Sequence, residues 1–250
     1  MEKIIIKNYE DPELNSPILI VGLPGIGNVG KIAVDYFIEK LKMKKIADIF
    51  SEYLPPQVFL FNSTIHLVRD SIYYKKTGKK SDLIFIAGDF QGTTQEGQYE
   101  LSYKIMEFLH KYKISKIYTL GGYSIGKIVE TPKVLGAVSD KKLMGSLEKV
   151  GISFPKGEPS GGIVGSAGLI LGIGKEIFSI EGACLMGETS GYFADPKGAK
   201  QIIEALSKIL KTKIDLKDIG EKAKQLEEIT EKMKEESKNK TSKEDLNYFG

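Results

Sequence analysis

The stretch "LIVGLPGIGNVGKIAVDYFIEKL" (residues 19–41) decides the fold, because it joins a buried strand to a helix through a glycine-rich turn. Residues 17–23 form the short apolar run that is typical of a strand buried on both faces. The residues after the turn place apolar side chains at helical spacing: Val29, Ile32, Ala33, Tyr36, Phe37 and Leu41. A strand, a tight turn and an amphipathic helix in this order predict an α/β protein.

The turn matches two phosphate-binding motifs at once. Gly25, Gly27 and Gly30 fit the G-x-G-x-x-G of dinucleotide-binding folds, whereas Gly25, Gly30 and Lys31 fit the G-x-x-x-x-G-K of nucleotide triphosphatases. In a triphosphatase the next residue is Ser or Thr, whose hydroxyl binds Mg²⁺, but here it is Ile32.

The same departure from the motif occurs a second time. "GGYSIGKI" (121–128) has a similar glycine and lysine spacing, and Ile128 again occupies the position of the magnesium ligand. Two departures of the same kind favour glycine-rich strand ends that need small residues for packing over two triphosphate sites.

Two acids keep a nucleotide- or nucleoside-binding enzyme as the alternative. Asp89 ends the run "LIFIAGD", where an acid could hold Mg²⁺, and Glu188 ends a strand, where an acid could bind a sugar hydroxyl. A structural interpretation of Glu188 is favoured, in which it caps the following turn or pairs with a lysine. The chain has only two histidines, His66 and His110, and neither lies beside a residue suited to hydride chemistry.

Composition excludes several classes of protein. One cysteine and two separated histidines do not form a recognisable zinc site, and no cofactor or metal is expected. Cys184 lies in the apolar run "GACLMG" and is predicted to be a buried structural thiol, which favours a reducing compartment. No apolar run approaches the roughly 18 residues of a membrane span, and no signal peptide opens the chain. We therefore expect a cytoplasmic protein with no membrane partner.

Charge also argues against a nucleic-acid partner. The 36 basic and 33 acidic residues are mixed along the chain and leave a formal net charge of +3. Arg69 is the only arginine, so bidentate clamps for phosphate are scarce. No basic stripe of the kind that binds a phosphate backbone is present in the sequence.

The order of apolar runs predicts a three-layer-like sandwich around a mixed sheet. Residues 57–76 predict a β-hairpin that turns at Asn62–Ser63, which breaks strict alternation of strand and helix. Asp195 and Pro196 predict a helix start, as cap and first helical residue. Further strands are predicted at 45–51, 82–89, 116–124 and 183–188, and further helices at 99–111 and near 140–149.

The composition changes near residue 214, which predicts an α/β domain over 1–213 followed by a charged helix and a mobile tail over 214–250. Ile219, Leu226 and Met233 recur every seven residues and form a thin apolar seam, suited to docking on the body or on a neighbour. This seam and the small-residue segment 161–174 both predict self-association into a homo-oligomer. From Ser237 onward the sequence is too polar to bury.

The ordered set of motifs resembles the proteasome-assembly chaperone family, and its archaeal branch in particular. The motifs are "VGLPGIGNVGKIAVDYFIEKL", "GDFQG", "TLGGYSIG", "GIVGSAGLILG" and "CLMGETSGYFADPKGA", which together cover roughly residues 15–211. The resemblance implies an α/β sandwich like that of nucleoside phosphorylases, no enzymatic activity, and oligomers that bind proteasome α subunits or the α ring.

The resemblance extends to the last residues, Leu246-Asn247-Tyr248-Phe249-Gly250. Proteasome chaperones and activators often end in a hydrophobic residue, Tyr and any residue, which enter pockets between α subunits with the terminal carboxylate paired to a lysine. In one register Tyr248 is the motif's tyrosine, one place early. In the other, Tyr248 is the hydrophobic residue, Phe249 replaces the tyrosine and Gly250 is the free position. Leu246, Tyr248, Phe249 and Gly250 are thus the predicted partner-binding residues.

Overall fold

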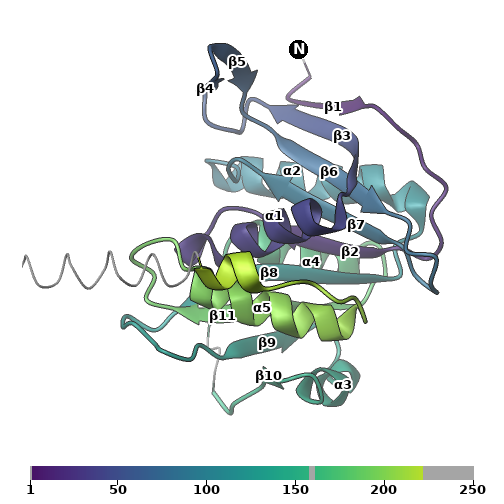
Figure 1. Ribbon diagram of the computed structural model, residues 1–250. Helices are drawn as coiled ribbons and strands as arrows, with labels where there is room; N and C mark the ends of the chain where they lie inside the picture. Colours follow the sequence, from purple (N-terminus) through teal and green to yellow (C-terminus); the bar gives the residue numbers. More distant parts are fainter. Residues whose placement is uncertain (1, 158–160, 222–250) are drawn as a thin grey trace, which may run out of the picture.

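A mixed β-sheet with helices on both faces organises the chain, and the computed structural model describes residues 2–157 and 161–221 (Figure 1). Buried residues form two clusters, one on each face of the sheet. The predicted three-layer arrangement with a mixed sheet is therefore confirmed.

Within the described residues, nine strands pair in the order β1-β3-β6-β7-β2-β8-β11-β9-β10. The central strands β7, β2, β8 and β11 are mutually parallel, whereas β1, β3 and β6 on one side and β9 on the other pair antiparallel with their inner neighbours. The bounds are β1 (Ile4–Asn8), β2 (Ile18–Gly22), β3 (Lys44–Ser51), β6 (Asp70–Lys75), β7 (Leu83–Gly88), β8 (Lys116–Ser124), β9 (Val134–Val138), β10 (Ile152–Ser153) and β11 (Gly182–Thr189).

The helices divide between the two faces. One buried cluster joins Val29 and Phe37 of α1 to Ile202 of α5, and the other joins Ile105 of α2 to Ile170 of α4. The bounds are α1 (Val29–Leu41), α2 (Gln95–Leu109), α3 (Met144–Glu148), α4 (Ser166–Glu176) and α5 (Pro196–Ile209), with 3-10 turns η1 (Ile26–Asn28), η2 (His110–Tyr112) and η3 (Lys141–Leu143). Each face of the sheet thus has its own helix pair.

The prediction of a hairpin over 57–76 is correct for the turn and wrong for the length of the hairpin. β4 (Val58–Phe61) and β5 (Thr64–Leu67) form a separate two-stranded sheet, and both Asn62 and Ser63 have positive φ, as the tight hairpin turn requires. The later residues form β6, which pairs with β3 and β7 in the main sheet. Figure 1 shows the hairpin projecting beyond the sheet.

Helices α2 and α5 each begin directly after a capping side chain. Asp195 accepts a hydrogen bond from the backbone N–H of Gly198 at 3.0 Å, and Pro196 is the first residue of α5, as predicted. The helix predicted over 99–111 begins earlier, at Gln95, because the Thr94 hydroxyl accepts from the N–H of Gly97 at 3.0 Å. The segment 161–174 contains the N-terminal part of α4.

The first residues after 213 pack on the domain. Tyr36 in α1 donates a hydrogen bond to the carbonyl of Asp215 at 2.7 Å, and Lys40 pairs with Asp218. Ile219 is buried in the cluster between α1 and α5, and residues 217–221 are helical. The start of the predicted seam therefore docks on the body of the same chain, whereas Leu226 and Met233 lie outside the described residues.

Gly30 lets α1 approach the sheet closely. A Cβ atom added to Gly30 would overlap the carbonyl oxygen of Leu120 in β8. Gly22, at the end of β2, is similarly tight, because an added Cβ would overlap the carbonyl of Gly30. Backbone atoms cannot move aside as a flexible side chain can, so these glycines set the spacing of the α1 layer.

Replacing Gly30 by alanine should lower the free energy of unfolding by about 1–3 kcal/mol, because the new methyl group overpacks against backbone. Gly145 in α3 is the control, since an added Cβ would meet nothing within 4 Å. Gly145→Ala should be neutral or stabilising by up to about 1 kcal/mol, because alanine is the better helix former. Chemical denaturation measures both, and equal effects would contradict the close-approach explanation.

Candidate functional site

The glycine turns lie where the parallel strands end, and they pack tightly against each other. Gly27 has φ of +61°, and a Cβ added there would lie 2.7 Å from the hydroxyl of Thr189 at the end of β11. A Cβ added to Gly122 in β8 would overlap the carbonyl of Ile26. The β2–α1 turn thus packs closely against the ends of β8 and β11, which gives the glycines a structural reason independent of any phosphate.

The charged residues of the nucleotide alternative already have protein partners. Lys31 pairs with Asp35 one helical turn away at 2.9 Å. The Asp89 carboxylate accepts a hydrogen bond from the backbone N–H of Arg69 at 3.1 Å, and Glu188 accepts one from the N–H of Lys133 at 2.9 Å. The Glu188 partner is thus a backbone N–H in the segment before β9, and not the following turn or the lysine ammonium group that the sequence suggested.

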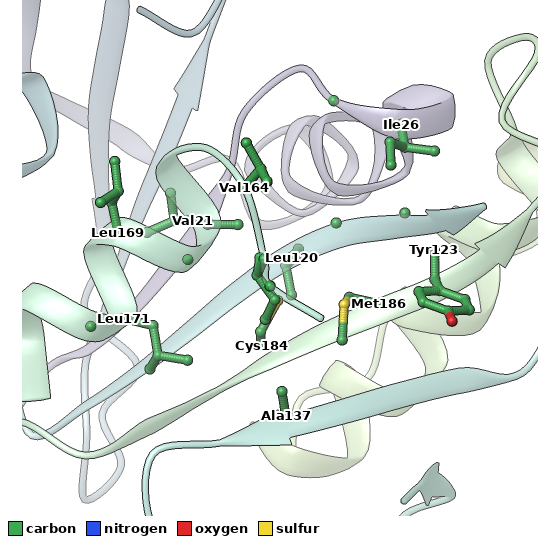
Figure 2. A pocket seen from close by; sticks show the side chains of 18 of the residues that line it. Val21, Ile26, Leu120, Tyr123, Ala137, Val164, Leu169, Leu171, Cys184 and Met186 are labelled. Carbon is green, nitrogen blue, oxygen red and sulfur yellow. The ribbon is translucent and has the colours of Figure 1, made fainter. Parts of the chain in front are cut away.

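A cavity of about 780 Å³ lies between the carboxyl ends of β2, β8 and β11 and helix α4 (Figure 2). Of the six candidate loop residues, only Gly25 is among the described residues that line it. Figure 2 shows Leu120, Cys184 and Met186 on the strands, Leu169 and Leu171 on α4, and Ile26 and Val164 on the loops above. The sequence did not indicate this cavity, because its walls come from distant segments.

The described lining of the cavity contains few side chains that could take part in a reaction. No carboxylate and no imidazole occurs among its described residues. The Cys184 thiol is fully buried, as predicted, and burial raises its pKa to about 11, so it is protonated at neutral pH. Lys175, the one lysine in the described lining, pairs with Glu176 at 3.0 Å. General acid–base chemistry is most often carried by His, Asp or Glu side chains, and none of these occurs in the described lining.

Gln91 connects two segments beside the cavity through hydrogen bonds, and it was not identified from the sequence. Its side-chain NH₂ donates to the carbonyl of Pro24 in the glycine turn, and its side-chain oxygen accepts from the N–H of Ser166 at 2.9 Å. The amide thus ties the β2–α1 turn to the N-terminus of α4, at one wall of the cavity. The motif "GDFQG" contains this residue, but its two partners are distant in sequence.

Asp70, at the start of β6, is a fully buried acid that was also missed. Its Oδ1 atom has no hydrogen-bond partner among the described residues. Burial raises the pKa of Asp70 well above its usual range, the negative charge of Asp89 raises it further, and Lys31 opposes both effects. A carboxyl group in this environment favours the neutral, protonated form.

The described part of the chain contains neither a candidate metal site nor a candidate membrane span. No group of three His, Cys, Asp or Glu side chains there is placed to hold a metal ion. None of the helices in the same residues is long and apolar enough to cross a membrane. The predicted partner-binding residues Leu246, Tyr248, Phe249 and Gly250 lie outside the described ranges.

The chain belongs to the PAC2 family, whose model matches residues 19–234. It is 37% identical over 260 residues to the uncharacterised protein MJ1210 of Methanocaldococcus jannaschii, an alignment that covers 100% of this chain and 99% of that one.

Two solved structures share the fold and part of the sequence. The crystal structure of Pyrococcus furiosus PbaB, described as an archaeal proteasome activator, is 37% identical, with a TM-score of 0.89 over 94% of this chain and 100% of that one. The structure of Pyrococcus furiosus PbaA, described as an archaeal homologue of proteasome-assembly chaperone, is 25% identical, with a TM-score of 0.77 over 99% and 98%. The suspected family resemblance is therefore confirmed.

ATP with Mg²⁺ should neither be hydrolysed nor raise the melting temperature, because Ile32 and Ile128 replace the magnesium ligand and Lys31 is paired with Asp35. A bound nucleotide at a hundredfold excess over its Kd would stabilise the fold by about 2.7 kcal/mol, which thermal unfolding detects readily. Tripolyphosphate at matched ionic strength is the control for non-specific anion effects. A magnesium-dependent shift seen with ATP alone would favour the enzyme alternative.

Asp70→Asn should stabilise the protein at pH 7–8, and the gain should shrink as the pH falls toward 4. The folded-state pKa of Asp70 lies above its unfolded value, so wild-type stability falls as pH rises between the two values. Each tenfold difference between the acid constants of Asp70 in the folded and unfolded states changes the free energy of unfolding by about 1.4 kcal/mol. Glu100→Gln on the exposed surface of α2 is the control and should keep the wild-type profile. Lower stability of Asp70→Asn at pH 8 would contradict a neutral Asp70.

Proposed function

We propose that the protein is a non-enzymatic proteasome-assembly chaperone or ATP-independent activator. It binds proteasome α subunits or the assembled α ring in the cytoplasm, and it does so as a homo-oligomer through its C-terminal tails. The observation that carries this proposal is the similarity to PbaB, which extends over nearly the whole chain at 37% identity.

The described site supports a binding protein more than an enzyme. The cavity at the strand ends is lined mainly by apolar side chains and glycine backbone, and its described lining contains no carboxylate or imidazole. Lys31, Asp89 and Glu188 are engaged by neighbouring protein groups. The nucleotide- or nucleoside-binding alternative therefore has the cavity in its favour but lacks groups in it for acid–base chemistry.

The last residues supply the proposed contact with the α ring. Tyr248 and Phe249 are two adjacent aromatic side chains at the end of a strongly polar segment, and Gly250 carries the carboxylate. In a pocket between α subunits, the carboxylate would pair with a lysine while the aromatic groups pack beside it. Several tails on one oligomer would convert weak single contacts into useful avidity, provided that the linkers span the pocket spacing.

Deleting Asn247–Gly250 should abolish binding to purified 20S proteasome and leave the melting temperature and oligomeric mass unchanged. The family match ends at residue 234, before the four residues removed, so the fold should not depend on them. Surface-immobilised proteasome and light scattering measure the two properties. The control is Asn239→Ala, an uncharged change in the same polar segment, which should bind as wild type does. Undiminished binding by the truncated protein would refute a role for the tail.

One alanine added after Gly250 keeps every side chain and moves the carboxylate by up to about 3.5 Å. Binding should be lost, because the carboxylate and the aromatic pair can no longer be placed together. Two substitutions then separate the registers. Phe249→Tyr should preserve or strengthen binding if Phe249 stands for the motif's tyrosine, whereas Tyr248→Ala should be the more damaging change if Tyr248 is that tyrosine.

A further inference from the structure

Exposed apolar side chains gather at one edge of the molecule. This edge, called here the carboxyl edge, is where β7, β2, β8 and β11 end, and β6 begins there because it runs antiparallel to β7. The loops at this edge expose Ile26 after β2, Ile128 after β8, Tyr192 and Phe193 after β11, and Val164 before α4. The hairpin β4–β5 precedes β6 and so extends from the same edge (Figure 1).

The hairpin presents a purely aliphatic face to solvent. Val58 pairs with Leu67 and Leu60 pairs with Ile65, so these four side chains share one face, and each is between 46% and 77% exposed. Residues 57–67 contain no Lys, Arg, Asp or Glu. An isolated two-stranded hairpin is only marginally stable in water, so an uncovered aliphatic face calls for a partner.

The opposite face of the hairpin fixes its position on the body. Phe59 stacks on Phe90 with ring centroids 6.1 Å apart and planes 5° from parallel. Phe90 packs against the buried cluster under α2 and α4, and it immediately precedes Gln91 in the cavity wall. The aliphatic face is thus held outward by a contact that uses the aromatic face.

A complementary apolar surface lies at the same edge. Val164 is 94% exposed and Ile26 is 50% exposed, and both line the mouth of the 780 Å³ cavity. Below them lie Leu120, Met186 and Leu169 (Figure 2). This rim and the cavity beneath it carry no carboxylate among the described lining residues, and Lys175, the one lysine there, pairs with Glu176, so they suit an uncharged, aliphatic insert.

We propose that the aliphatic face of the hairpin packs on the rim and cavity of a second copy of this chain, and that two copies exchange hairpins reciprocally about a two-fold axis. A hairpin-on-hairpin contact would cover only four side chains from each copy. Stable interfaces bury roughly 800 Å² per partner, which calls for a larger surface. Reciprocal exchange covers both hairpins and both rims at once, and two-fold dimers are the commonest symmetric assemblies.

This proposal rests on the homo-oligomer proposed above, and its test does not involve the proteasome. Leu60→Cys and Val164→Cys are made singly and together. Mild oxidation of the double variant should give a disulfide-linked dimer on a non-reducing gel. Each single variant and the wild type should stay monomeric on that gel, because Cys184 is buried. Equal cross-linking by Leu60→Cys alone would overturn the proposal in favour of hairpin-on-hairpin contact, and no cross-linking in the double variant would also overturn it.

Light scattering gives a second readout. Leu60→Asp should lower the oligomer to half its mass or to the 27.7 kDa monomer, because the charge would be buried against apolar groups. Tyr99→Asp, on the exposed surface of α2, is the matched control and should keep the parent mass. Ile65→Ser repeats the test with a smaller change, and circular dichroism checks folding. An unchanged mass in both hairpin variants, or a monomeric parent, would overturn the proposal.

Discussion

The close approach of α1 to the sheet is the constraint on which the rest of the structure depends. Gly30 lies so near the carbonyl of Leu120 that any side chain there would overlap backbone. This contact sets the spacing of the α1 layer and carries the preceding turn across the ends of β8 and β11. Gly27 in the turn and Gly122 in β8 then follow from the same crowding, since Gly27 lies against the Thr189 side chain and Gly122 against the carbonyl of Ile26.

Crowding of this kind explains the phosphate-motif spacing without requiring a phosphate site. A nucleotide loop also needs small residues close to a helix N-terminus, so the two purposes select the same residue type at similar intervals. They differ in the charged groups around the turn. Lys31 and Asp89 are held by Asp35 and by the backbone of Arg69, and the cavity beside the turn has an apolar lining. The described lining of this site is therefore mainly apolar surface.

The carboxyl edge is where the crowded turn and the exposed apolar surfaces of this PAC2 family member occur together. The turn after β2 and the loop before α4 leave the apolar residues Ile26 and Val164 exposed at this edge. The hairpin adds an uncharged aliphatic face at the same edge, anchored by Phe59 on Phe90. Membership of the PAC2 family and the likeness to PbaB place these surfaces in a group of proteins that includes a proteasome activator.

The sequence by itself determined what short-range chemistry specifies: the β2–α1 unit, the cap at Asp195, the turn at Asn62–Ser63 and the buried thiol of Cys184. These depend on periodicity and on residues a few positions apart. Only the tertiary structure decided that β4 and β5 leave the main sheet, that Asp70 is buried, and that Gln91 joins Pro24 to Ser166. Strand order, burial of an acidic side chain and a bridge between loops all depend on contacts between residues far apart in the chain, which leave no local pattern.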